Sequence, residues 1–80
     1  MKLPRDLSGR QLVAVLCRRW AYRVSHQRGS HIVLETDVPA SFSVTVPDHS
    51  PVRIGTLNAI LRTVAQQKGV TKEEVAASLA

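Results

Sequence analysis

The sequence predicts an α+β fold with the element order α-β-β-β-α, a three-stranded antiparallel sheet and both main helices on one face of it. Apolar residues recur at helical spacing in two segments, about 9–20 and about 55–69. Between them, apolar and polar residues alternate over 22–27, 30–36 and 42–46, as in short strands. The connection at Arg28-Gly29 is too short for a crossover, so the next strand returns antiparallel. Helices at both ends can cover one apolar sheet face, which leaves the other face open.

The first helix has a start signal and an apolar stripe. Ser8 is a favourable N-cap, and Gln11 three residues later completes a capping box. Cys17 belongs to the stripe, so we interpret it as a small core residue. It is the only cysteine, and no disulfide within the chain is possible. The stripe consists of Leu12, Val13, Leu16, Cys17 and Trp20.

The alternation within the strands predicts which side chains face the open side of the sheet. In the second strand, Ile32 and Leu34 form the core pair, so His31 points to the open face. Arg23 on the first strand is expected there too, whereas Tyr22, Val24 and His26 share its other face. A bulge would break this parity, and Gly29 would accommodate one. In the third strand, Phe42, Val44 and Val46 are expected in the core, and Ser43 and Thr45 on the open face.

The second helix begins near Gly55-Thr56, and Gly69 is placed to end it. Thr71 and Glu74 predict a capping box for a short third helix. We therefore expect residues 1–80 to form one domain, with a core of about 1–70 and a helical extension of 71–80. The apolar stripe of the second helix is Leu57, Ile60, Leu61 and Val64.

The charge of the chain favours an anionic partner, either nucleic acid or an acidic protein. Eleven Lys and Arg residues stand against six Asp and Glu, a formal net charge of +5. Arginine predominates, and its planar fork suits phosphate. Eighty residues leave no room for a cofactor domain, and no cofactor is expected. Neither an apolar signal region nor an apolar run of membrane-spanning length is present, so the expected location is the cytoplasm and not a membrane.

His31 is the candidate for chemistry, because imidazole both takes and gives a proton near neutral pH. On local grounds alone, an ordinary polar residue of a hairpin is the favoured interpretation of His31. A metal site formed by His26, His31 and His49 is disfavoured by the irregular spacing and the lack of a Cys or Asp cluster. A nucleophilic pair of Cys17 with a histidine is disfavoured because Cys17 is expected to be buried. No chemical role is assigned to His49.

Several short motifs occur together in a characteristic order. Leu7-Ser8-Gly9 opens the first helix, and Gly29-Ser30-His31 opens the second strand. Val44-Thr45-Val46-Pro47 forms the third strand, with His49 just after it, and Gly55-Thr56-Leu57 opens the second helix. Over about residues 1–70, the chain resembles the HicA-type toxins, which are mRNA interferases of bacterial toxin–antitoxin pairs. Its predicted topology also resembles the double-stranded-RNA-binding domain.

The resemblance to HicA-type toxins implies ribosome-independent and metal-independent RNA cleavage, with one essential histidine that corresponds to His31. It also implies a cognate HicB-type antitoxin as a protein partner. We expect His31 to act as general acid or base, with Arg23, Arg28, Gly29 and Ser30 contacting the RNA. Two other readings stay open: a non-catalytic RNA-binding module of the same fold, and a basic protein-interaction domain.

Overall fold

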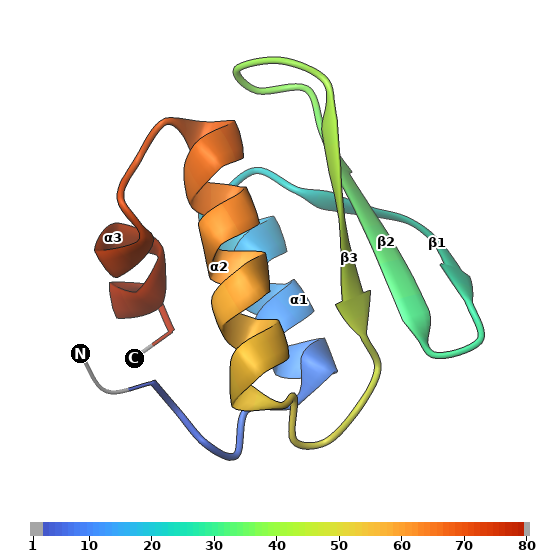
Figure 1. Ribbon diagram of the computed structural model, residues 1–80. Coiled ribbons are helices and arrows are strands. Elements are labelled where there is room, and N and C mark those ends of the chain that lie inside the picture. The colour runs from blue at the N-terminus through green and yellow to red at the C-terminus, as the bar shows by residue number, and fades with distance from the viewer. Residues whose placement is uncertain (1–2, 80) are drawn as a thin grey trace.

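The computed structural model describes residues 3–79 and confirms the predicted α+β fold. The sheet is antiparallel, with the strand order β1-β2-β3. Helices α1 and α2 lie together on one side of the sheet, and α3 packs against α2 (Figure 1). The elements are α1 (Gly9–Arg19), β1 (Arg23–Arg28), β2 (His31–Thr36), β3 (Phe42–Pro47), α2 (Ile54–Lys68) and α3 (Lys72–Ala77).

Helix α1 starts as the sequence predicts. The backbone N–H of Gln11 donates to Ser8 Oγ at 3.1 Å, and Gln11 Oε1 accepts from the backbone N–H of Ser8 at 2.9 Å. These reciprocal bonds satisfy donors that the first turn of a helix leaves free. Leu12 and Leu16 are fully buried beneath the sheet. Cys17 is only partly buried against the core, and burial raises the pKa of its thiol.

The predicted side-chain parity holds for β2 but not throughout β1. Ile32, Leu34 and Thr36 of β2 are buried, so His31 faces away from the helices. In β1, the register shifts between Val24 and His26, which makes a bulge there and not at Gly29. The extra residue moves His26 onto the open face, opposite Val33. The expectation that His26 shares a face with Tyr22 and Val24 was therefore wrong.

The core lies between the sheet and the helices, and one residue expected in it lies outside. Val44 and Val46 are buried, whereas Phe42 is 39% exposed. Phe42 pairs with Thr36 at the end of the sheet, where the helical layer supplies a polar group. There, Lys68 Nζ donates to Thr36 Oγ1 at 2.8 Å and also to the carbonyl of Val38. The apolar layer ends at this ammonium group. Its partial burial disfavours the charged form and lowers the pKa of Lys68.

The C-terminal part of the fold follows the sequence closely. Helix α2 ends at Gly69, which has the left-handed conformation (φ 68°). Thr71 Oγ1 then accepts from the backbone N–H of Glu74 at 3.1 Å and caps α3, which is one of the two hydrogen bonds of the predicted capping box. Val75 and Ala76 of α3 are buried in the same core as α2. Among residues 3–79, no helix has both the length and the apolar character needed to cross a bilayer.

Candidate functional site

His31 is the first residue of β2 and lies exposed on the open face of the sheet. A two-residue turn, Gly29-Ser30, precedes it, and Gly29 has a φ of 58° that glycine adopts without strain. Arg28 pairs directly with His31 across the hairpin, so the two side chains share a face. The turn therefore fixes a cation beside the imidazole.

The structure brings His31 together with His49 in one shallow hollow of about 450 Å³. His31 comes from β2, and its strand partner in β3 is Pro47, so the residues after Pro47 lie beside it. His49 reaches the hollow from the loop after β3, and Arg53 reaches it from the start of α2. Five of the six lining residues thus have polar side chains, and Arg53 carries a positive charge. It consists of His31, Thr45, Pro47, His49, Arg53 and Thr56.

The first turn of α2 adds to the positive character of the hollow. Arg53 is the N-cap of α2, and its side chain makes no capping hydrogen bond. The first turn contains no acidic residue, and Thr56 lies in it. Because helix N-termini carry partial positive charge, this end of α2 favours an anion. Thr45 and Thr56 also line a second groove of about 410 Å³ between β3 and α2, with Ser43 and Thr63 as further hydroxyl groups.

The loop that carries His49 is fixed by its backbone at two points. The N–H of Asp48 donates to the carbonyl of Ser30 at 2.6 Å, which ties the loop to the residue before His31. The carbonyl of His49 accepts from the N–H of Gly9 at 2.8 Å, which ties it to the start of α1. The relative placement of the two histidines therefore depends on main-chain hydrogen bonds, not on their own side chains.

The side chain of Asp48 adds a third attachment. Arg10 donates to both Asp48 oxygens, from Nε at 3.2 Å and from Nη2 at 3.1 Å. Gln27 Nε2 donates to Asp48 Oδ2 at 3.1 Å. These hydrogen bonds, Arg10 first and then Gln27, hold the pKa of Asp48 below its ordinary value near 3.8. The loop is thereby linked to α1 and to β1.

The ion pair of Asp48 predicts an acid-dependent loss of stability. The pKa of Asp48 is lower in the folded protein than in the unfolded chain. Its contribution to the free energy of unfolding is therefore complete above the ordinary carboxyl pKa and is lost as the pH falls through the lowered pKa. We expect Asp48→Asn to be less stable than wild type at pH 7 and to approach it at pH 3. Urea denaturation at both pH values measures the difference.

Arg10→Gln is the matched variant for this prediction, because it removes the principal partner of Asp48 and leaves the carboxylate. We expect the stability of Arg10→Gln to change less between pH 7 and pH 3 than the stability of wild type does. A full acid dependence in Arg10→Gln would show that the pairing with Arg10 is not its cause.

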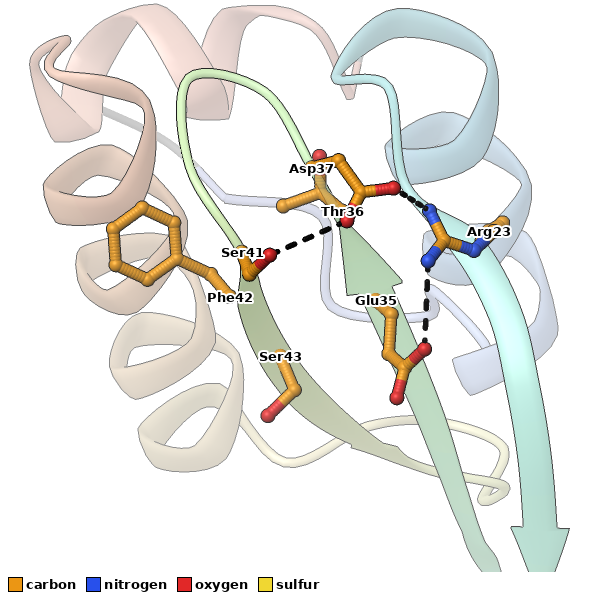
Figure 2. Close-up of a pocket in the computed structure, with 7 residues that line it drawn as sticks. All are labelled: Arg23, Glu35, Thr36, Asp37, Ser41, Phe42 and Ser43. Atoms are coloured by element: carbon orange, nitrogen blue, oxygen red, sulfur yellow. Dashed lines mark hydrogen bonds and ion pairs between the residues drawn. The ribbon is translucent and has the colours of Figure 1, made fainter.

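Arg23, expected to contact RNA, lies at the other end of the sheet. It pairs with Glu35, four residues after His31, which is about 13 Å along the strand at 3.3 Å per residue. Its guanidinium contacts Asp37 at 2.9 Å and Glu35 at 3.6 Å. Figure 2 shows both carboxylates next to the guanidinium of Arg23. They line a further pocket, distinct from the groove between β3 and α2, and Ser43 lines both. The positive charge of Arg23 is thus locally balanced.

The other three predicted RNA contacts lie beside His31. Arg28 is its strand partner, and Gly29 and Ser30 form the turn before it. Both turn carbonyls already accept hydrogen bonds, Gly29 from Gln27 Nε2 and Ser30 from the N–H of Asp48. These carbonyls position the turn, and the Ser30 hydroxyl is the group that remains exposed for a ligand.

Sequence reasoning did not place two residues of the hollow, His49 and Arg53, beside His31. The signal that finds His49 is the register: an antiparallel third strand that ends at Pro47 opposite His31 must deliver the next residues to the same place. Arg53 follows, because the connector leads directly into α2.

The three histidines do not form a common cluster. His26 lies elsewhere on the open face, where its Nδ1 is 3.1 Å from Ser25 Oγ. Within residues 3–79, no three His, Cys, Asp or Glu side chains come together as a set that could hold a metal ion. His31 and His49 are the two that share the hollow.

Comparison with protein families gives the class of this protein, which is a toxin of a bacterial toxin–antitoxin pair. The family model described as "HicA toxin of bacterial toxin-antitoxin" matches residues 9–65. The chain belongs to the HicA toxin family. The match runs from the start of α1 into α2 and includes every residue of the hollow. No curated protein and no solved structure matched the chain.

Proposed function

We propose that this HicA-family toxin is an endoribonuclease that cleaves mRNA in the cytoplasm, without the ribosome and without a metal ion. The observation that carries the proposal is the exposed His31 in a hollow with Arg53, with Arg28 beside it, on a chain of net charge +5. These groups combine a proton-transferring side chain with cations that hold a phosphate. The antitoxin that neutralises the protein is of the HicB type.

In the proposed reaction, the 2′-hydroxyl of the RNA attacks the adjacent phosphorus. His31 acts as general acid or general base on the scissile phosphodiester, and such assistance is worth about 10²–10⁴-fold. Arg28 and Arg53 balance the negative charge that develops on the phosphoryl oxygens. Attack by the 2′-hydroxyl accounts for the choice of RNA over DNA. The groove between β3 and α2 offers hydroxyl groups to the neighbouring nucleotides.

The open face of the sheet is the surface on which we place both RNA and antitoxin. An antitoxin that covers His31 and Arg28 blocks the site directly. Because the face carries cations, acidic groups on the antitoxin complement it and speed association. Arg23 lies near the far end of this face, so only an RNA or a partner that runs along the sheet contacts it together with His31.

An RNA cleavage assay with the purified protein tests the proposed function. We expect wild-type protein to cut a transcript in the absence of ribosomes and in excess EDTA. The upstream fragments should end in a 2′,3′-cyclic phosphate, and DNA of the same sequence should stay intact. Addition of the HicB-type antitoxin should stop the cleavage.

The same assay separates the rival readings. RNA binding that weakens steeply with salt, without cleavage products, would identify a non-catalytic RNA-binding module. Absence of both cleavage and binding at moderate salt would favour a basic protein-interaction domain. Either result would overturn the proposed endoribonuclease.

A further inference from the structure

We propose that His49 is a second catalytic residue, which transfers the other proton of the cleavage reaction that His31 assists. This inference rests on the proposed ribonuclease function and adds a residue to it. The observation behind it is that β2 and the loop after β3 deliver one imidazole each to the same hollow.

Cleavage of an RNA phosphodiester requires two proton transfers at different oxygens. The 2′-hydroxyl loses its proton as the bond from O2′ to phosphorus forms. The 5′-oxygen gains a proton as its bond to phosphorus breaks, which leaves a 2′,3′-cyclic phosphate and a 5′-hydroxyl. The entering and leaving oxygens lie roughly in line through phosphorus, so one imidazole is poorly placed for both. Two imidazoles from different elements can serve one oxygen each.

The backbone holds His49 in place for this role. The loop is bound on one side to the carbonyl of Ser30, which directly precedes His31, and on the other to the N–H of Gly9. Gly9 approaches so closely that a Cβ there would lie 1.9 Å from the carbonyl oxygen of Pro47. This packing leaves the loop little freedom, while the His49 side chain itself stays exposed in the hollow.

The charges around the two rings are those expected at a phosphate site. Arg53 lines the hollow with both histidines, and Arg28 lies across the hairpin from His31. The carboxylate of Asp48, the residue before His49, is held by Arg10 on α1. A phosphate that binds between the rings is therefore flanked by Arg28 and Arg53, and Asp48 is engaged elsewhere.

Three alanine variants separate a proton-transfer role for His49 from a structural one. His49→Ala and His31→Ala are each expected to lower the cleavage rate by about 10²–10⁴-fold. His26→Ala is the control, because it removes a histidine from the same sheet face but from outside the hollow. It should cleave at the wild-type rate. His49→Ala keeps the main-chain hydrogen bond to Gly9, so its urea midpoint should match that of wild type.

The decisive substrate is an oligonucleotide that contains a cleavage site mapped with wild-type protein and a sulfur atom in place of the bridging 5′-oxygen. A thiolate leaves without a proton, so this substrate restores a variant that lacks the general acid and does not restore one that lacks the general base. We expect it to rescue one of the two variants, His31→Ala or His49→Ala, and not the other. The wild-type pH–rate profile should have two limbs, and His49→Ala should lose one of them.

The outcomes distinguish this inference from the function on which it rests. If wild-type protein cleaves RNA and His49→Ala does so equally fast, the role of His49 is overturned and the ribonuclease stands. Rescue of both variants or of neither overturns complementary proton transfer by the two histidines. If wild-type protein does not cleave RNA at all, both proposals fall together.

Discussion

The variant His31→Ala is expected to cleave RNA about 10²–10⁴-fold more slowly than wild-type protein, with little change in fold or RNA affinity. The His31 side chain is exposed on the open face and supports no part of the core, so its loss leaves the packing intact. Affinity should persist because phosphate binding depends on the arginines. Single-turnover cleavage of an end-labelled RNA measures the rate.

Two accompanying measurements make the result for His31→Ala interpretable. Fluorescence polarisation with a 2′-O-methyl RNA, which cannot be cleaved through its 2′-oxygen, reports affinity. Urea denaturation reports stability, and both should match wild type. A His31→Ala preparation that cuts RNA at the wild-type rate would refute the assignment of His31.

Gly9→Ala is expected to cause the largest loss of stability of any single methyl addition at a glycine of the chain. The new Cβ would lie 1.9 Å from the carbonyl oxygen of Pro47, 3.0 Å from its carbonyl carbon and 3.2 Å from Asp48 Cα. All three atoms are backbone, so the start of α1 and the loop must separate. Overpacking of this kind costs about 3 kcal/mol, a large part of the roughly 4–12 kcal/mol that stabilises a domain of this size.

Gly55→Ala is the matched control, since it also lies in the first turn of a helix and a Cβ there meets nothing within 4 Å. We expect it to stabilise the protein by about 0.5–1 kcal/mol through the lower backbone entropy of the unfolded chain. Urea denaturation of both variants checks the pair. Equal stability of Gly9→Ala and wild type would mean that α1 and the loop can part without cost.

The overall fold was readable from the sequence because each element has its own local signal. The capping box at Ser8, the alternation around Ile32 and Leu34, and Gly69 at the end of α2 are all confirmed. Phe42 was misplaced because the sequence does not show that Lys68 supplies a polar end to the helical layer. That contact joins residues far apart in the chain, and the alternation of apolar and polar residues cannot reveal it.

The candidate site was only half predictable, for a similar reason. The open face of β2 follows from period, and it placed His31 correctly away from the core. Which residues lie beside His31 depends on the strand register and on a bulge. Register brings His49 into the hollow, and the bulge turns His26 and Arg28 toward the open face. Neither leaves a strong mark in one sequence, because a bulge needs no particular residue and register is set by pairing.

The irregularity in β1 also bears on self-association. β1 is one of the two edge strands of the sheet that the structure describes, and all six of its residues are exposed. A long, flat, apolar strand edge tends to pair with a second molecule. The bulge between Val24 and His26 twists this edge, and Arg23 and Arg28 place charge at its two ends. These features disfavour strand-to-strand pairing of two molecules through β1, although this edge lies beside the candidate site.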